Sequence, residues 1–146
     1  MLCFKFLIFL LLLLLPAGGI FASEESIQFN EIAWMGSLPK SGETSTQTSN
    51  NEWIELYNTS GNLVDLSGWQ IVAEDGTPSM NLSGNISSKG YFLLERTSDD
   101  SVAGVTADQI YTGALSNSGE KLVLKNLSGT VVDQIDAQSG WPAGDN

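Results

Sequence analysis

Apolar and polar residues alternate in short stretches along most of the chain. Ile54 and Leu56 flank Glu55, and residues 121–125 repeat the alternation. A repeat of two residues is typical of a β-strand with one buried face, because successive side chains point to opposite sides of a sheet. Alternation, together with short apolar runs between turns, predicts strands at residues 27–34, 52–58, 69–73, 80–86, 91–96, 121–125 and 131–137.

Turn-forming residues separate the predicted strands. Asp75-Gly76 favours a tight hairpin, and residues 126–130 join the last two strands as a second hairpin. Residues 91–96 are the most apolar of the strands and are expected at the centre of a sheet, whereas residues 80–86 are expected at an edge. Short strands, turns about every 8–12 residues and no amphipathic helix together predict an all-β sandwich.

One long connection interrupts this series of strands. Residues 37–51 consist almost wholly of Gly, Ser, Thr, Pro, Gln, Asn and Lys, without an apolar period, which predicts a loop. Its length is near the upper limit for an ordinary connection, about 12–15 residues. Because it holds no cluster of charged or aromatic side chains, we interpret it as a tolerated insertion rather than a binding loop.

The N-terminal segment has a different character. Lys5 is followed by an unbroken apolar run from Phe6 to Leu15, then by a Pro and two Gly residues, and then by acidic residues after Ala22. This layout predicts a signal peptide at residues 1–22, cleaved after Ala22, and therefore a protein secreted or held at the cell surface. The alternative is an uncleaved anchor, although the apolar run is about half of the roughly 20 residues that span a bilayer. No membrane span is expected once the signal is removed.

Several motifs resemble those of a known family. The stretch Glu52–Asn58 (EWIELYN), followed by Val64–Trp69 (VDLSGW), is similar to the signature of the lamin tail domain. Gly90–Arg96 (GYFLLER) and Leu115–Leu122 (LSNSGEKL) resemble further segments of that family, in the family's order. The resemblance covers residues 27–146 and implies an immunoglobulin-like β-sandwich of the type found in bacterial secreted proteins as well as in nuclear lamins.

The resemblance also carries two expectations about the rest of the molecule. Family members usually continue past a segment like Gly140–Asn146 into a further strand, so the domain at residues 27–146 is expected to lack its last strand. The nuclear roles of lamins are not expected, because the chain has no coiled-coil heptads, no basic localisation run and no prenylation motif.

The composition excludes common catalytic chemistry. The chain has no histidine, and its one cysteine, Cys3, lies within the predicted signal peptide, which excludes Ser-His-Asp and Cys-His catalysis and the usual zinc sites. Carboxylate pairs do occur, but we expect them on turns or exposed strand faces rather than across a cleft. We therefore predict a protein that is not an enzyme, with no catalytic, cofactor-binding or metal-binding residues. The pairs are Glu52/Glu55, Glu74/Asp75, Asp99/Asp100 and Asp133/Asp136.

Charge limits the possible partners. All 17 acidic residues follow Ala22, together with five of the six basic residues, and the whole chain has a formal charge of −11. Binding to a phosphate backbone needs clustered Lys and Arg, so direct binding of nucleic acid is not expected. We interpret the acidity as a source of solubility and mutual repulsion.

Three groups of residues are weaker candidates for binding. Asp99, Asp100 and Asp108 could offer oxygen ligands to calcium from one loop, although their spacing fits no EF-hand. The tryptophans could line a carbohydrate-binding face, but packing is the favoured interpretation. Four glycosylation sequons lie in or beside predicted turns, where glycans are expected to be tolerated. The tryptophans are Trp34, Trp53, Trp69 and Trp141, and the sequons begin at Asn58, Asn81, Asn85 and Asn126.

These observations lead to one functional hypothesis and two alternatives. The hypothesis is a non-catalytic secreted or cell-surface module that binds or scaffolds an unknown protein or cell-surface partner. The first alternative is an accessory domain of a longer extracellular hydrolase or nuclease whose catalytic part lies beyond Asn146. The second alternative is a calcium- or glycan-binding module.

Overall fold

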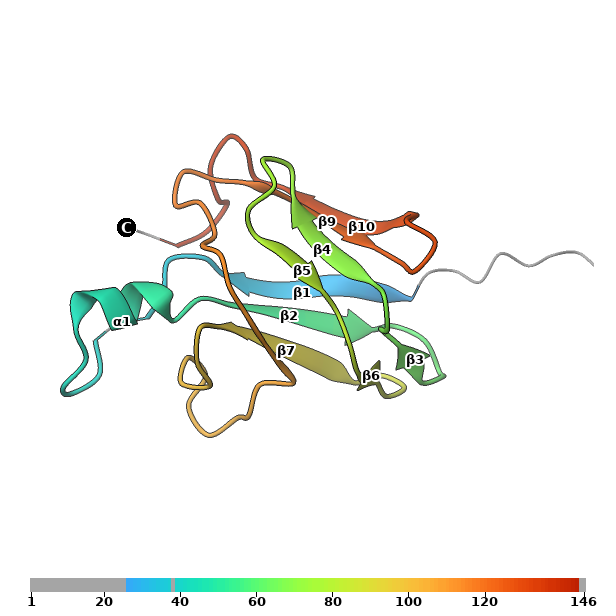
Figure 1. Ribbon diagram of the computed structural model, residues 1–146, viewed down its shortest axis with the longest axis horizontal. Helices are drawn as coiled ribbons and strands as arrows, with labels where there is room; N and C mark the ends of the chain where they lie inside the picture. The colour runs from blue at the N-terminus through green and yellow to red at the C-terminus, as the bar shows by residue number, and fades with distance from the viewer. Residues whose placement is uncertain (1–25, 38, 145–146) are drawn as a thin grey trace, which may run out of the picture.

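Two four-stranded sheets pack face to face in the computed structural model, which describes residues 26–37 and 39–144. The first has the order β1-β2-β7-β8 and the second β10-β9-β4-β5, with a small two-stranded sheet, β3-β6, at one end (Figure 1). The all-β sandwich is therefore confirmed, whereas the predicted signal peptide lies outside the described residues. The elements are β1 Ile27–Ala33, α1 Ser45–Asn50, β2 Trp53–Asn58, β3 Val64–Asp65, β4 Gln70–Ala73, β5 Ser79–Asn81, β6 Asn85–Ile86, β7 Tyr91–Arg96, β8 Gln109–Tyr111, β9 Lys121–Lys125 and β10 Val131–Asp136.

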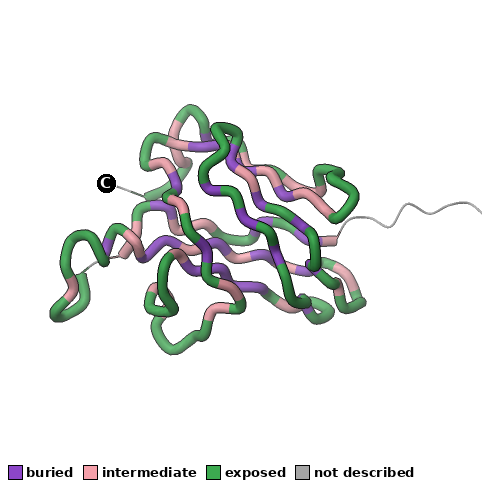
Figure 2. Tube along the Cα trace, in the orientation of Figure 1, coloured by how far each residue is buried: buried purple, intermediate pink, exposed green. Residues whose placement is uncertain are grey.

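The core lies between the two sheets and follows the alternation of the sequence. Ile54 and Leu56 of β2 and Leu122 and Leu124 of β9 are fully buried, and the side chains between them in sequence are only half-buried. Figure 2 shows this alternation of buried and less buried residues along the strands. Burial of each such side chain stabilises the fold by about 1.5–3 kcal/mol, so the facing apolar rows hold the layers together.

The predicted hairpins and the central strand are present. β4 pairs with β5 across the Asp75-Gly76 turn, and β9 pairs with β10, both antiparallel. β7 lies in the interior of its sheet, between β2 and the parallel strand β8.

The predicted strand at residues 80–86 is wrong in one respect, because the chain forms two short strands there. β5 lies at a sheet edge as expected, but β6 leaves that sheet and pairs with β3. Gly84 lies between them with a φ of +103°, a conformation that residues with a side chain rarely adopt. This backbone turn redirects the chain between the two strands.

The loop predicted at residues 37–51 is also corrected, because it contains the helix α1. The Thr44 hydroxyl accepts a hydrogen bond from the Gln47 backbone N–H at 3.3 Å, and the Gln47 side chain accepts one from the Thr44 N–H at 2.9 Å. This reciprocal capping box starts a helix that has no apolar stripe, which is why periodicity does not reveal it. Within the described residues, no helix is long and apolar enough to cross a membrane.

Candidate functional site

The two sides of the sandwich are bordered by edge strands of different length. On one side the edge strands β5 and β8 have three residues each, and the Gln109 side chain of β8 joins them. Its amide donates to the Asn81 carbonyl at 2.8 Å and accepts from the Ser83 N–H at 3.1 Å. On the other side the edge strands β1 and β10, of seven and six residues, contact each other. Short, bridged edges resist pairing with another chain, whereas long edges invite it.

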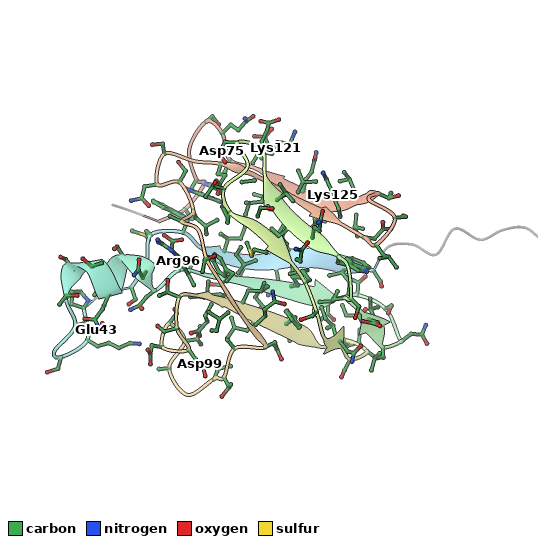
Figure 3. All side chains as sticks on the ribbon, in the orientation of Figure 1. Glu43, Asp75, Arg96, Asp99, Lys121 and Lys125 are labelled. Atoms are coloured by element: carbon green, nitrogen blue, oxygen red, sulfur yellow. The ribbon has the colours of Figure 1, made fainter. Side chains whose placement is uncertain are left out.

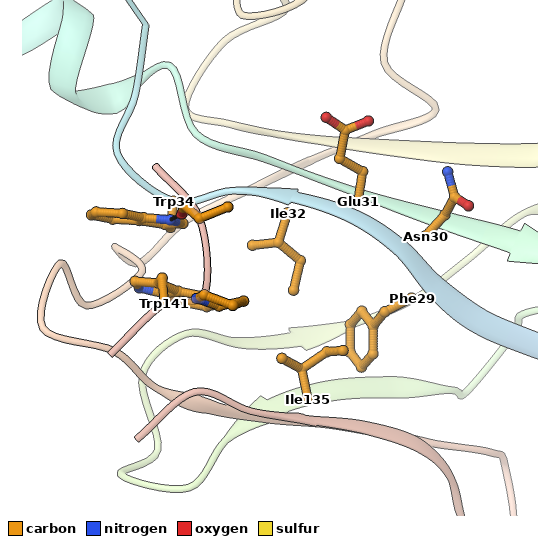
Figure 4. A pocket seen from close by; sticks show the side chains of 9 residues that line it. Phe29, Asn30, Glu31, Ile32, Trp34, Ile135 and Trp141 are labelled. Carbon is orange, nitrogen blue, oxygen red and sulfur yellow. Dashed lines mark hydrogen bonds between the residues drawn. The ribbon is translucent and has the colours of Figure 1, made fainter. Parts of the chain in front are cut away.

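An apolar groove runs between the edge strands β1 and β10. Phe29 and Ile32 of β1 face Ile135 of β10 across it, and Trp34 and Trp141 stand at one end (Figure 4). The hollow has a volume of about 190 Å³. Ile32 and Ile135 are only partly buried although both pack against the core. The core is therefore incompletely covered along this side of the sandwich.

A bulge in β1 sets the direction of its side chains. The register with β2 shifts between Phe29 and Glu31, so that Asn30 is an extra residue. As a result Phe29 and Ile32 both face the groove, while the Asn30 and Glu31 side chains point away from it (Figure 4). A single stretch of strand thus presents an apolar inner face and a polar outer face.

The backbone of β1 offers unpaired groups toward the groove. The Phe29 N–H donates to the Asp133 carboxylate at 2.8 Å, so it faces away from β2. In the pairing of β1 with β2, Phe29 is opposite Leu56 and Ile32 is opposite Ile54. Leu56 and Ile54 are two residues apart on β2. In an antiparallel ladder every second residue points its N–H and C=O in the same direction. The Ile32 backbone therefore also faces outward, on the side where β10 contacts β1 without pairing with it in a sheet.

Two tryptophans close one end of the groove. The rings of Trp34 and Trp141 stack with centroids 5.9 Å apart and planes 7° apart. The Trp34 indole N–H donates to the Ala143 carbonyl at 3.0 Å, and that of Trp141 donates to the Ser116 carbonyl at 2.7 Å. Trp34 is buried, as is Trp69 elsewhere in the core, so both pack within the fold. The stacked pair is at once part of the packing and the end wall of the groove.

Three acidic side chains lie near the groove, on β1, β2 and β10, and we call Glu31, Glu55 and Asp133 the acidic rim. Glu31 and Glu55 are directly opposite each other on β1 and β2, and the Asn30 amide donates to Glu55 at 2.6 Å. Like charges at opposed positions repel each other. Neither of the ion pairs found among the described residues, Arg96–Glu52 and Lys121–Glu74, involves the acidic rim.

Some carboxylates expected to be exposed are instead buried. Glu52, immediately before β2, is 3% exposed. One of its oxygens lies 2.8 Å from the Arg96 guanidinium, and the other accepts from the Leu115 N–H at 2.8 Å. Burial raises the pKa of Glu52, while the Leu115 N–H and the Arg96 charge oppose that shift. Glu52 therefore ties the start of β2 to the end of β7 and to the segment before β9.

Glu120 is a second buried carboxylate, at the start of β9. Within the described part of the chain, neither of its oxygens forms a hydrogen bond of good geometry, although the Ser116 backbone N–H lies close enough to affect its charge. Burial raises its pKa to about 7, and the Asp75 charge adds to the shift, while the Ser116 backbone N–H opposes it. Asp75 and Lys121 line the same small hollow and lie at the same end of the molecule (Figure 3). This carboxyl can exchange a proton near neutral pH.

The calcium candidates of the loop after β7 are engaged in backbone hydrogen bonds. The Asp99 carboxylate accepts from the Ala107 N–H at 2.7 Å, and that of Asp108 accepts from the Leu93 N–H at 2.8 Å. Asp99 lies on the outer part of this loop (Figure 3), and the Asp100 carbonyl contacts the Lys40 ammonium. In residues 26–37 and 39–144 no group of three or more His, Cys, Asp or Glu side chains could hold a metal ion. Asp99 and Asp108 therefore already serve as acceptors for backbone N–H groups of the fold.

Comparison with known families agrees with the architecture and with the motifs of β2 and β7. The family model of the lamin tail domain matches residues 22–139, which is well over half of the chain. The chain belongs to the lamin tail domain family. No match was found among curated proteins. Lamin tail domains are immunoglobulin-like modules and are not typically catalytic.

One sequon of this lamin tail domain cannot carry a glycan in the folded state, contrary to the expectation for turns. Asn58 is fully buried, and its amide donates to the carbonyls of Asn62, Ile86 and Ser87 at 2.7–3.1 Å. Its side chain is therefore a structural bridge between β2, β6 and the turns around them. The asparagines of two other sequons, Asn81 and Asn85, are exposed.

Sequence reasoning missed the groove of this lamin tail domain. The signals were present in part, because Phe29 and Ile32 are three residues apart and do not fit a strict alternation. That break in period indicates the bulge. The position of Ile135 opposite them depends on how the two sheets pack, which no local pattern specifies.

Proposed function

We propose that this lamin tail domain is a non-catalytic binding module that works outside the cell, secreted or attached to the surface, and holds a protein partner at the groove between β1 and β10. The apolar run at residues 6–15, with the break that follows it, supports export. The absence of histidine from the whole sequence supports a role in binding rather than acid–base catalysis.

The observation that carries the proposal is the incomplete cover of the core at the groove. Ile32 and Ile135 pack against the core but remain partly accessible, next to unpaired backbone groups of β1. Apolar surface combined with convergent polar groups is typical of a recognition site. A partner that places apolar side chains there removes this surface from water, which favours association.

Export is tested by expressing residues 1–146 in a bacterial host. The product is collected from the periplasm or medium, and its N-terminus is sequenced. We expect it to begin at Ser23, because cleavage after Ala22 fits the layout of the segment. An intact N-terminus in the membrane fraction indicates an anchored surface protein, whereas a product confined to the cytoplasm contradicts the extracellular role.

Binding at the groove is tested with peptides selected from a random display library on the exported product. Ile135→Ser places a polar group in the groove, and we expect it to weaken the selected peptides by about tenfold or more through the lost apolar contact. Val131→Ser is the matched control, because Val131 is exposed on the same strand and does not line the groove. Equal binding to both variants contradicts a functional groove.

A further inference from the structure

We infer that the outer face of the first sheet, formed by β1, β2 and β7, is a second recognition site, and that it takes an arginine side chain of a protein partner. The guanidinium stacks on the paired rings of Tyr57 and Tyr91 and pairs with the carboxylates of Glu31 and Glu55. This inference goes beyond the function proposed above, because the outer face is turned away from the groove and binds independently of it.

The pairing of the strands places these four side chains on one surface. The side chains of β2 alternate, and those on its inner face are buried in the core, so Glu55 and Tyr57 point to the outer face. Tyr57 is opposite Tyr91 of β7, and Glu55 is opposite Glu31 of β1. An aromatic pair and an acidic pair therefore lie in adjacent rows of the same sheet face.

The aromatic pair offers a surface for a flat cation. The ring centroids of Tyr57 and Tyr91 are 4.9 Å apart, with the planes inclined by 36°. Such a cross-strand pair contributes to the stability of the sheet, yet Tyr91 remains 57% exposed. The face of an aromatic ring carries partial negative charge, so a cation that stacks on it is attracted.

The acidic pair has no compensating charge in the described part of the chain. Glu31 and Glu55 repel each other across neighbouring strands, and neither takes part in the ion pairs of the described residues. The Asn30 amide, a neutral donor, bonds to Glu55. Lys89, two residues before Tyr91, contacts the Thr59 carbonyl instead. A cation brought by a partner relieves this repulsion.

The spacing of the two rows favours arginine over lysine. Glu55 and Tyr57 are two residues apart on β2, which corresponds to about 6.4–6.8 Å along a strand. A guanidinium that lies flat on the Tyr57 ring points its N–H donors outward in the plane of the group, toward the neighbouring carboxylate. An ammonium group is a point charge without such a plane. Arginine is thus the side chain that uses both rows at once.

The arginine has to come from a different protein. The 146 residues contain a single arginine, Arg96, and its guanidinium is already paired with the buried Glu52 at 2.8 Å. A second copy of the chain therefore cannot supply the side chain. The formal charge of −11 also repels a second copy and attracts a basic partner.

The inference is tested with short Gly/Ser peptides that differ in one central residue. The test peptide carries Arg, and the comparison peptides carry Lys or citrulline, which has a shape close to that of Arg but no charge. Each is titrated into the ¹⁵N-labelled exported product and followed by amide chemical shifts. We expect the largest shifts at Glu55, Tyr57 and Tyr91, and at least about threefold weaker binding of the Lys and citrulline peptides. Binding of the Arg peptide should weaken between about 0.1 M and about 1 M salt.

Protein variants test the two rows separately. Tyr91→Leu removes the ring but keeps an apolar side chain, and Glu55→Gln removes the charge but keeps an oxygen for the Asn30 amide. We expect each to weaken the Arg peptide at least about threefold. Asp100→Asn makes the same change of charge as Glu55→Gln at an exposed position in the loop after β7, and is expected to have less than about a twofold effect. Thermal unfolding shows whether each variant retains the fold.

A groove variant separates this site from the one proposed above. Ile135→Ser is expected to leave the affinity for the Arg peptide within about twofold, because Ile135 lies in the groove. A loss as large as that of Tyr91→Leu shows that the peptide binds in the groove, and the inference then fails. Library-selected peptides that depend on Ile135 support the groove whatever the Arg peptide does.

Two further results would overturn the inference. Equal binding of the Arg and citrulline peptides excludes recognition of the guanidinium charge. Binding of a neutral oligosaccharide that is independent of salt and needs Tyr91 but not Glu55, together with no binding of the Arg peptide, identifies the outer face as a carbohydrate site instead.

Discussion

At the scale of single residues, the burial of certain polar side chains could not be predicted from the sequence. Glu52 and Glu120 look like surface carboxylates because each borders a strand, and Asn58 looks like part of a turn. Their burial depends on partners distant in sequence, such as Arg96 for Glu52. Local periodicity indicates which face of a strand a residue occupies, but it does not indicate which group will form a hydrogen bond or ion pair with a buried polar side chain.

The raised pKa of Glu120 makes stability depend on pH. Its carboxyl titrates near pH 7 in the folded protein and near the ordinary value of 4.5 when unfolded. The folded state therefore binds the proton more tightly, and this stabilising contribution, complete below pH 4.5, is lost as pH rises through 7. We expect the melting temperature to fall across this window and the fall to be smaller in Glu120→Gln. Glu74→Gln, at a more exposed carboxylate in the same hollow, is the control and should not flatten the profile.

Asn58 is predicted to be the most sensitive polar residue of the fold. Asn58→Ala leaves the Ile86 and Ser87 carbonyls without their amide donor and removes the acceptor of the Ser60 N–H. We expect a loss of about 2–4 kcal/mol in the free energy of unfolding by urea titration, because several buried groups lose their partners together. Asn62→Ala changes an exposed side chain nearby and is expected to stay within about 0.5 kcal/mol. Similar losses in both variants would contradict the bridging role.

At the scale of secondary-structure elements, strongly apolar or alternating segments were a reliable guide to strands, and weakly patterned segments were not. Residues 52–58, 91–96 and 121–125 correspond to β2, β7 and β9 within about one residue, which is within the usual uncertainty of strand ends. The elements that differ are α1, β3, β6 and β8. The first is held by a polar capping box, and the others are too short to show a period.

The loop after β7 is predicted to depend on one carboxylate. Glu95 is fully buried, and its two oxygens accept from the Ser101 and Val102 backbone N–H groups at 2.8 Å. Glu95→Gln removes the charge and directs an amide donor at one of these donors. We expect a loss of about 1.5–3 kcal/mol and faster hydrogen exchange at Ser101 and Val102. Protection at Leu94, within β7, should fall only with global stability, so a selective loss there would contradict a local effect.

At the scale of the whole molecule, the fold class could be predicted from the sequence, but the groove between β1 and β10 could not. Short strands separated by turns were enough to predict a sandwich, and the motifs of β2 and β7 were enough to indicate the family. Which strands become edges depends on long-range pairing, and only that pairing brings Ile32 and Ile135 together. The groove is therefore a property of topology rather than of any segment.

The overall charge leads to a prediction about nucleic acid. With a formal charge of −11 and scattered basic residues, the protein should repel a phosphate backbone. We expect a dissociation constant for duplex DNA weaker than about 10⁻⁴ M at physiological salt, the weak limit of ordinary non-specific binding. Fluorescence anisotropy of a labelled oligonucleotide provides the measurement, with a basic DNA-binding domain as positive control. Saturable binding that weakens steeply with salt would show that a basic site exists after all.

The bridge formed by Gln109 has a consequence for stoichiometry. It joins the short strands on one side, while the long strands β1 and β10 share the other side. Because the Gln109 bridge and the short strands leave no template on the first side, strand pairing with another chain could involve at most the second side of the molecule. Rising concentration should therefore increase occupancy without increasing the size of the assembly, so that the domain ends a series of strand pairings instead of extending it into a fibre.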